Sequence, residues 1–570
     1  MSAPSQPAPA RVPTPIDAIA ERWVDTVARL RPTKGTYIGH PGSNHRLGDL
    51  SPEGLAEEET EARRSLAELS AAPPQDAVDA VTQRALGDQL RLLIEQSEAG
   101  LPLRNLNVIE SPLQEIRDSF DLMPRQTEAD WADTVSRLNA VEDALAGYRE
   151  SLRAGVRAGN PPARRQALVV GAQAARHGAD TGFFRALAAG ATGLGPAQHA
   201  ALTAAADRAA RAYADTADFL RTELAPAAPE RDGVGREHYA LASRGFLGAT
   251  VDLDESYEWG LAEVARMAAE QERIAREIVP GGGVPEAIAA LDADPARVLH
   301  GTEALQRWMQ DTSDRAVAEL GATHFDIPEP LRRLDCRIAP TQEGGIYYSQ
   351  PSDDFSRPGQ MWWSVPPGVT EFTTWRELTT VYHEGVPGHH LQIGSGVLNR
   401  GTLNAWRRQL AGTAGHEEGW ALYAERLMAE LGYLADPGDR FGMLDGQRMR
   451  AARVVIDLGV HLGKQRPDGG GVWDAEAAFA FLREHVTMDP AFVEFEVNRY
   501  LGWPGQAPAY KIGQRRWEQL REAAAVRAGA DFDIREFHRE ALSLGTVGLD
   551  TLAWALDGGA AAAVASGGGR

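Results

Sequence analysis

The sequence predicts a mainly α-helical protein that carries one small antiparallel β-sheet. Apolar residues recur at spacings of three and four along most of the chain, which is the pattern of helices with one buried face. From about residue 333 the sequence pattern changes to short stretches of β-branched and aromatic residues bounded by Gly and Pro, which is typical of short strands. With 43% hydrophobic and 24% charged residues, the composition is that of an ordinary globular protein. A large multi-helix body is therefore expected.

The predicted helices begin with residues 16–30, where Ile16, Ile19, Trp23 and Val27 form one apolar stripe. Similar stripes define the helices that follow, and Gly- and Pro-rich turns such as "AGNPPARR" separate several of them. These stripes cover residues 54–70, 78–98, 128–153, 196–222, 253–278 and 302–319. Helices are predicted again from about residue 372 to about residue 554.

Two or three short strands are predicted in "CRIAP", "GGIYYSQPS" and "GQMWWSVPPG". No internal repeat is evident. Residues 1–15 are rich in Pro and Ala and residues 556–570 in Gly and Ala, and both ends are expected to be disordered. Residues 16–555 are expected to form a single large domain. It divides into an N-terminal helical half, about 16–330, and a second half, about 331–555, that contains the candidate catalytic residues.

Net charge and cysteine content exclude several classes of function. The 58 basic and 80 acidic residues give a net charge of −22, which argues against a nucleic-acid partner, because no basic stripe is there to neutralise phosphates. Cys336 is the only cysteine, which excludes internal disulfides and thiolate metal clusters, and a buried structural thiol is expected. No run of about 18 apolar residues would span a membrane, and the N-terminus lacks the pattern of a secretion signal. A cytoplasmic location is expected.

The segment "VYHEGVPGHHLQ", residues 381–392, is the main candidate for chemistry. It is close to H-E-x-x-H, in which two histidines at i and i+4 bind zinc from one helix face and the glutamate is the base. Here His383 and His389 are six residues apart. On a regular helix this spacing turns the second side chain about 120° away from alignment with the first. A regular helix would therefore not let both histidines bind one metal ion.

The spacer "GVPG" is predicted to break or bulge this helix. Pro387 has no N–H to bond the carbonyl of His383, its ring would clash with that carbonyl, and the two glycines permit unusual backbone conformations. A two-residue bulge would bring His389 roughly to the place of an i+4 histidine. His390 faces the right way but would lie about 10 Å along the axis. His389 is therefore the favoured ligand and His390 the alternative.

A third ligand is predicted downstream, in "GTAGHEEGWALYAERL". Glu418 and Glu425 are seven residues apart and share one helix face, whereas Glu417 points elsewhere. A helix that crosses beside the broken one would offer Glu418 to the metal and Glu425 to the back of a histidine ring. Glu417 is the alternative ligand. The competing explanation is a histidine-rich helix end beside solvated glutamates, which the combination of motifs disfavours.

These residues predict one Zn²⁺ per chain, held by His383, His389 and Glu418, with Glu384 as the base that takes a proton from a metal-activated water. The predicted function is a zinc-dependent hydrolase that cleaves peptide (amide) bonds in short peptides or peptide-like substrates. Two alternatives stay open. One is metal-dependent hydrolysis of a specialised non-peptide amide or ester, and the other is a metal-free helical binding protein.

"YHEGVPGHHLQ", "EGWALYAERL" and "RAARVVIDLGVHLG" resemble a widespread bacterial family known as domain of unknown function 885. Its members resemble gluzincin metallopeptidases of the oligopeptidase, carboxypeptidase Taq and angiotensin-converting-enzyme type. "NVIESPLQEIRDSFDLMP" and "FHREALSLGTVGL" also look like family segments, so the resemblance covers nearly the whole chain. It implies a helical body divided by a deep substrate channel, with zinc on its floor. In the related peptidases Gly-His before an apolar pair ends the active-site helix, which supports His389; the two extra spacer residues depart from that pattern.

The resemblance also implies roles for residues late in the chain. In "RMRAARVVIDLGVHLGK", His461 is expected to donate to the substrate carbonyl, and Arg450 or Arg453 to anchor a substrate carboxylate. An exposed ladder of salt bridges is the alternative for this helix face. Tyr510 is expected to stabilise the oxyanion, with a packed structural tyrosine as the alternative. Lys511, beside it, is assigned to substrate binding.

The strand region before the histidines is expected to line the substrate channel. In zinc peptidases the strand before the active-site helix commonly pairs with an extended substrate. Tyr347, Tyr348 and Arg357 are therefore assigned to substrate binding, together with His390. For the aromatic residues, packing in the core is the alternative.

Overall fold

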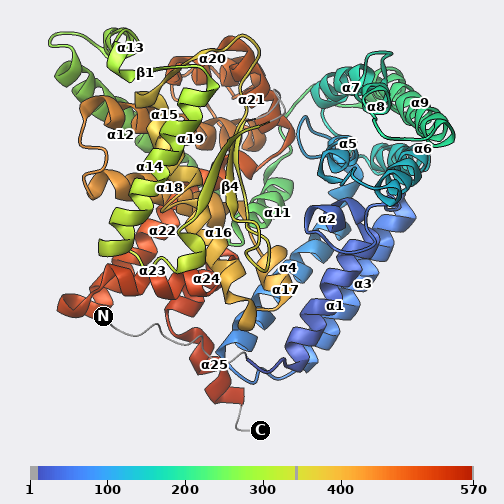
Figure 1. Cartoon of the computed structure of the whole chain (residues 1–570), viewed down its shortest axis with the longest axis horizontal. Helices are drawn as coiled ribbons and strands as arrows, with labels where there is room; N and C mark the ends of the chain where they lie inside the picture. Colours follow the sequence, from blue (N-terminus) through green and yellow to red (C-terminus); the bar gives the residue numbers. More distant parts are fainter. Residues whose placement is uncertain (1–10, 340–344, 568–570) are drawn as a thin grey trace.

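The computed structural model describes residues 11–339 and 345–567 and consists mainly of helices, which confirms the predicted fold class (Figure 1). The N-terminal helices are α1 (Pro15–Leu30), α2 (Pro32–Tyr37), α3 (Pro52–Ala71), α4 (Ala77–Glu98), η1 (Pro102–Arg104), α5 (Pro112–Leu122), α6 (Glu128–Arg157), α7 (Arg164–Gly178), α8 (Phe183–Ala189), α9 (Pro196–Phe219), η2 (Leu220–Leu224), α10 (Ala225–Ala227), α11 (Arg236–Leu247), α12 (Leu253–Ile278), α13 (Val284–Asp292), η3 (Pro295–Arg297) and α14 (Thr302–Thr323).

The C-terminal half contains η4 (Glu329–Leu331), α15 (Thr374–Glu384), α16 (His389–Leu398), η5 (Asn399–Gly401), α17 (Ala405–Gln409), α18 (Ala414–Glu430), α19 (Pro437–Leu462), α20 (Ala475–His485), α21 (Pro490–Gly502), α22 (Gln506–Ala528), η6 (Gly529–Asp531), α23 (Ile534–Ser543), α24 (Leu549–Leu556) and α25 (Gly559–Gly567). Each helix predicted from an apolar stripe is therefore confirmed, with ends that differ by a few residues. None of the helices in the described residues combines the length and the apolar character needed to cross a lipid bilayer.

Local capping explains where some of these helices begin. At the start of α1, the Thr14 hydroxyl accepts a hydrogen bond from the backbone N–H of Asp17, whose carboxylate accepts one from the N–H of Thr14. The pair Thr127 and Asp130 repeats this arrangement at the start of α6. Such reciprocal caps bind N–H groups that the helix itself leaves unpaired, and so they fix the first turn.

The hydrophobic core is divided into a large cluster and two smaller ones. The large cluster joins α1, α3 and α4 to α11, α12, α18, α19 and α22, so the first helices of the chain pack with the last. A second cluster is confined to the region from η1 to α10, which forms the teal part at the upper right of Figure 1. The third lies between α14, α15 and the strands. α19 and α22 thus lie in the centre of the body, beside the helices that carry the histidines.

The strand segments form two small sheets. β2 (Leu334–Ile338), β3 (Ile346–Ser349) and β4 (Gly359–Trp363) make a sheet of order β2-β4-β3, which confirms the predicted strands. β3 pairs antiparallel with β4, but β2 pairs with β4 in parallel, so this sheet is mixed. A second antiparallel pair, β1 (Val298–His300) with β5 (Glu371–Thr373), was not predicted because three-residue strands carry too little pattern.

Cys336 lies in β2 and is only 3% exposed, so the expected buried thiol is confirmed. Its Sγ lies 3.6 Å from the hydroxyl of Ser313, and burial raises its pKa to about 11. The thiol therefore stays protonated and unreactive at neutral pH.

Most of the C-terminal tail is helical where disorder was predicted, and residues 568–570 lie outside the described residues. α25 covers Gly559–Gly567, Ala560 is buried, and Val564 packs against the large core cluster. The run of alanines explains the correction, because alanine has the highest intrinsic helix propensity. At the other end, residues 1–10 lie outside the described residues. Arg11 is held by ion pairs to Asp17 and Asp76, at 2.6 and 2.5 Å.

A buried carboxyl on α19 makes the stability of the fold depend on pH. Asp457 accepts hydrogen bonds from Tyr239 Oη at 2.6 Å and Gly505 N at 2.9 Å, and burial raises its pKa from 3.8 to about 7. Between these pH values the carboxyl is ionised in the unfolded chain and neutral in the folded one. Unfolding therefore releases a proton, and the free energy of unfolding should fall by about 4 kcal/mol as pH rises through this window.

Asp457→Asn keeps an acceptor oxygen for Tyr239 and Gly505 but cannot ionise. Denaturant unfolding at pH 5 and pH 8 should show that wild type loses about 3 kcal/mol more than the variant over this range. Equal losses in the two proteins would contradict the raised pKa.

Candidate metal centre

The helix break predicted at "GVPG" is present, because α15 ends at Glu384 and α16 begins at His389. The indole Nε1 of Trp420 on α18 donates to two backbone carbonyls at this break, and the Gly388 carbonyl also accepts from the N–H of Gln392 at 3.2 Å. The indole nitrogen thus contacts the segment between the two helices. It lies 2.8 Å from the carbonyl oxygen of Pro387 and 3.3 Å from that of Gly388. The interrupted segment is therefore fastened directly to the helix that carries the third predicted ligand.

Gly388 allows the chain to fold back so closely at this break. A Cβ atom at this position would lie 1.9 Å from the carbonyl oxygen of His383 and 2.5 Å from that of Tyr382. Both are backbone atoms and cannot turn away. A residue without a side chain is therefore required here.

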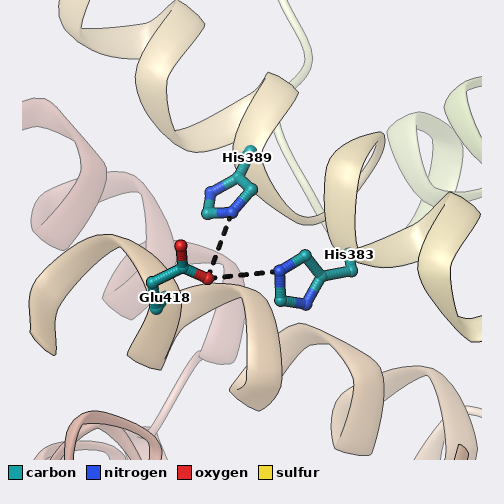
Figure 2. A group of neighbouring side chains, drawn as sticks. All are labelled: His383, His389 and Glu418. Carbon is teal, nitrogen blue, oxygen red and sulfur yellow. Dashed lines mark ion pairs between the residues drawn. The ribbon is translucent and has the colours of Figure 1, made fainter. Parts of the chain in front are cut away.

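The break brings the two predicted histidines together, as Figure 2 shows. The imidazoles of His383 and His389 have ring centroids 4.9 Å apart and are nearly perpendicular. Their Nε2 atoms lie 3.3 and 3.6 Å from the same oxygen, Oε2 of Glu418 on α18. One potential ligand atom from each residue lies within 4.8 Å of the others. Glu417, the alternative ligand, lies against Gly412 instead.

This donor set suits a zinc ion. Two imidazoles and one carboxylate, with a further position open, are typical of catalytic zinc. Glu418 Oε2 and His389 Nδ1 are buried and have no hydrogen-bond partner among the described residues. Buried polar atoms normally form hydrogen bonds, so a carboxylate oxygen that forms none and faces two imidazole nitrogens fits a bound cation. The Glu418 side chain is 23% exposed, so the group can be reached from solvent.

Electrostatics at the group favour a cation. Burial opposes charge on His383, but the neighbouring carboxylates of Glu418 and Glu425 raise its pKa to about 10. Burial alone would raise the pKa of Glu418, yet His383 and His389 hold it well below its ordinary value. The Glu418 carboxylate is thus ionised. It stabilises a proton on the neighbouring imidazole of His383, and a metal ion would displace that proton.

A chain of buried side chains supports His383 from behind. Its Nδ1 lies 2.8 Å from Glu425 Oε1, and Gln447 on α19 donates from Nε2 to the other Glu425 oxygen at 3.0 Å. The ionised carboxylate accepts from Nδ1–H, so Nε2 is the nitrogen that would bind a metal ion after losing its proton. Sequence reasoning identified Glu425 but missed Gln447, because a single glutamine in a helix carries no recognisable signal.

Lys511 belongs to this supporting chain rather than to a substrate-binding surface. It is 2% exposed in its side chain, and its Nζ lies 2.8 Å from Gln447 Oε1, 2.8 Å from Gln514 Oε1 and 3.2 Å from Glu263 Oε1. An ammonium group has three donors, and all three are occupied by protein. Because Lys511 donates to the amide oxygen of Gln447, it turns the amide NH₂ toward Glu425.

Replacing Lys511 with Met should therefore weaken zinc affinity about tenfold, in the range found when outer-shell partners of metal ligands are lost. Competition against a zinc chelator measures this affinity. Lys464→Met is the matched control, because the Lys464 side chain pairs with Asp254 away from the metal group. Equal zinc affinity in Lys511→Met and the control would disprove this role.

Glu384, the predicted base, is 7% exposed and lies beside the metal group. Burial raises its pKa; the charges of His383 and His389 oppose this rise, and that of Glu418 adds to it. The side chain thus lies in the same electrostatic environment as the ligands. A carboxylate with a raised pKa is a better proton acceptor than an exposed one.

Arg450 lies near this carboxylate, since its charge opposes the rise in the pKa of Glu384. Its Nε is buried and has no hydrogen-bond partner among the described residues. It is therefore the predicted arginine that is available to a ligand. Arg453, one turn further along α19, is engaged instead: it donates to Glu496 at 2.7 Å and to Tyr500 Oη at 2.9 Å.

Tyr510 is placed near the metal group from α22. Burial, together with the charge of Glu418, raises its pKa to about 12, so its hydroxyl remains a hydrogen-bond donor at neutral pH. The guanidinium of Arg453 lies 4.9 Å from the centre of its ring. Arg453 thus positions the tyrosine, in place of the predicted contact with substrate.

The structure does not bring His461 to the metal group. On α19, Gln447 is the residue that bonds Glu425 behind the proposed ligands. His461 lies 14 residues later on this helix, or about 21 Å further along its axis. Its Nε2 is 3.0 Å from the carbonyl oxygen of Tyr500, and burial lowers its pKa to about 4. It is a neutral, buried histidine, which corrects the expectation that it donates to a substrate carbonyl.

The residues assigned to the substrate-lining strand divide into buried and exposed ones. His390 is fully buried, with Nδ1 3.0 Å from Tyr348 Oη and Nε2 2.9 Å from the carbonyl oxygen of Leu331. Both of its ring nitrogens are occupied, so it holds Tyr348 and is neither a ligand nor a free substrate contact. Tyr347 is 41% exposed, and Arg357 lies in an exposed turn, where it donates to Gln350 O at 2.8 Å.

The sequence profile of a bacterial protein family of unknown function, DUF885, matches residues 32–556, which is most of the chain. The chain belongs to the DUF885 family. The resemblance noted in the sequence is thus confirmed at the level of the family. None of the curated proteins matches this DUF885 chain.

Solved structures share the fold of this DUF885 protein. A protein of Colwellia psychrerythraea described as a "putative lipoprotein" is 22% identical, with a TM-score of 0.82 over 96% of this chain and 99% of its own. A second one, from Shewanella oneidensis and of unknown function, is 16% identical, with a TM-score of 0.74 over 96% and 100% of the two chains. At these identities the likeness establishes the fold alone.

Proposed function

We propose that this protein is a zinc-dependent hydrolase that cleaves peptide (amide) bonds in short peptides or peptide-like substrates. The observation that supports it most is the convergence of His383, His389 and Glu418 on one position, with the carboxylate of Glu384 beside them. A metal site that only stabilised the fold would need no such additional carboxylate. A catalytic one needs a base for the attacking water.

A bound Zn²⁺ would act as a Lewis acid and lower the pKa of a water molecule at the site. Glu384 takes the proton from that water and returns it to the leaving amine. The hydroxyl of Tyr510 donates to the carbonyl oxygen on which negative charge develops. Arg450 offers a guanidinium with an unpaired Nε to a substrate carboxylate or to the same oxygen.

The proposal includes a relationship to gluzincin-type peptidases, because the broken H-E-x-x-P-G-H-H segment and the downstream glutamate match their ligand order. It also includes one zinc ion per chain and a cytoplasmic location. These points rest on sequence pattern together with the geometry of the metal group.

Two measurements test the proposal. Protein purified without added zinc should contain about one zinc per chain by elemental analysis, and it should hydrolyse some members of a panel of dipeptides, blocked peptides and acylated amino acids. A chelator should remove the activity, and zinc should restore it. Hydrolysis of non-peptide amides or esters alone would favour a specialised hydrolase. No zinc and no uptake on titration would favour a metal-free binding protein.

A further inference from the structure

A cavity of about 470 Å³ lies away from the metal group. Its walls come from the start of α3, from η1, α5, α6 and α11, and from residues 501–504 at the end of α21 and just after it. In the view of Figure 1, α11 stands between the N-terminal helices and the C-terminal body. None of the proposed metal ligands lines this space. Its volume is within the range of sites that bind small organic molecules.

The walls of the cavity are largely apolar. Leu50, Leu106 and Ile116 line it from the N-terminal helices. Phe246 and Trp503 line it from the other side, with their rings in edge contact at 5.3 Å between centroids. Apolar and aromatic walls of this kind bind the hydrocarbon part of a ligand, and a few polar groups then fix its orientation.

Arg104 places a positive charge without a carboxylate partner in this wall. Its Nη1 lies 2.9 Å from Asn160 Oδ1 and 3.0 Å from His238 Nδ1, both of which are neutral partners. No described carboxylate lies within ion-pair distance of it. Burial and the nearby charge of Arg231 lower its pKa, as expected for a cation without compensation. An anionic group would stabilise it strongly.

Glu115 on α5 supplies the opposite charge. Its carboxylate forms no ion pair within 4 Å among the described residues, although its charge adds to the larger effect of Glu58 in raising the pKa of Arg31. The other acidic side chains of the wall are engaged. They are Glu58 with Arg31 at 2.7 Å, Asp232 with Arg165 at 3.1 Å, and the exposed Asp49 with the backbone N–H of Ser51 at 2.9 Å.

Gln166 adds an oriented acceptor. It is 1% exposed, and its amide nitrogen donates to the carbonyl oxygen of Asn498 at 3.0 Å, which fixes the direction of the amide. Its Oε1 is buried and has no hydrogen-bond partner among the described residues. A buried acceptor without a partner carries a free-energy cost that an N–H donor of a ligand would remove.

We propose that this cavity binds a short apolar peptide with both ends free, such as a dipeptide of leucine-like residues. Its carboxylate pairs with Arg104, its ammonium group pairs with Glu115, its amide N–H faces Gln166, and its side chains lie against Phe246 and Trp503. A zwitterion matches the wall because Arg104 and Glu115 carry opposite charges and neither forms an ion pair among the described residues. The inference goes beyond the proposed hydrolysis, because binding here needs neither the metal nor Glu384.

Isothermal titration of the full-length chain tests this assignment, with Glu384→Gln as background and with metal removed so that no probe is consumed. The probes are L-leucyl-L-leucine, its N-acetyl derivative and its C-terminal amide. The free dipeptide should bind at least about tenfold more tightly than either capped form, because each cap removes one charge pair. Equal binding of all three probes would overturn the proposal.

Two variants assign the charges to residues. Arg104→Gln should weaken the free dipeptide about tenfold and leave the amide unchanged, whereas Glu115→Gln should weaken the free dipeptide and leave the acetylated form unchanged. Arg153→Gln, an arginine on α6 that pairs with Glu223, is the control. Thermal unfolding checks that each variant is folded. If both variants are folded and bind like the control, the site is not this cavity, whatever the zinc content and hydrolysis of the wild-type protein show.

Discussion

Replacing Glu384 with Gln should lower kcat/KM for any hydrolysed substrate by about 10³-fold or more while leaving one zinc ion bound per chain. The amide has nearly the same shape as the carboxylate but cannot accept a proton at neutral pH, so the step in which water is deprotonated loses its base. None of the three proposed metal ligands is altered. Steady-state kinetics and elemental analysis on the same preparation measure both quantities.

Glu377→Gln is the matched control for this variant. Glu377 lies two turns earlier on the same helix, α15, and is also surrounded by protein, since burial raises its pKa to about 7. It has no part in the proposed chemistry, so its replacement should leave kcat/KM within about threefold of wild type. Full activity in Glu384→Gln would eliminate the proposed mechanism. Loss of zinc in that variant would show that Glu384 is itself a ligand.

Replacing Gly388 with Ala should weaken zinc binding at least about a hundredfold and lower the melting temperature. The added Cβ would lie 1.9 Å from the carbonyl oxygen of His383. The backbone must therefore move, and the segment that moves carries His389. Misplacing one of three ligands removes most of the affinity of the site, because metal binding requires near-ideal distances and geometry.

Gly396→Ala tests whether this effect is local. Gly396 lies on the same helix as His389, and a Cβ there would meet only Gly545 Cα at 3.9 Å, which is an ordinary contact. This variant should bind zinc like wild type and should be slightly more stable, since alanine is favoured over glycine in helices. A chelator competition assay compares the two proteins. Wild-type affinity in Gly388→Ala would show that the close turn at Gly388 does not determine the metal geometry.

Much of this architecture could be predicted from the sequence because its signals are local. Apolar stripes define the long helices, and Pro387 between two glycines defines the break that realigns His389 with His383. The face shared by Glu418 and Glu425 follows from a spacing of seven residues on one helix. In each case the information lies within a few turns of chain.

The sequence could not predict which residues of a long helix lie next to the metal group. On α19, Gln447 near the middle of the helix donates to Glu425, which supports the proposed ligand His383. His461, at the end of the helix, does not reach this group. Spacing alone gives the face of a helix but not the level at which another helix crosses it. Lys511 shows the same limit. It adjoins Tyr510 in sequence, yet neighbouring helix residues point about 100° apart, so Lys511 faces the back of the site.

Because the indole of Trp420 fastens the interrupted helix to its neighbour through direct hydrogen bonds, we expect the metal group to keep its shape when no ion is bound. Removing the metal with a chelator should leave a folded protein with a preformed binding site. Zinc should then rebind in one step. The proposed hydrolase would then be regulated by zinc supply: the active fraction in a cell would follow the free zinc concentration without any cost of refolding.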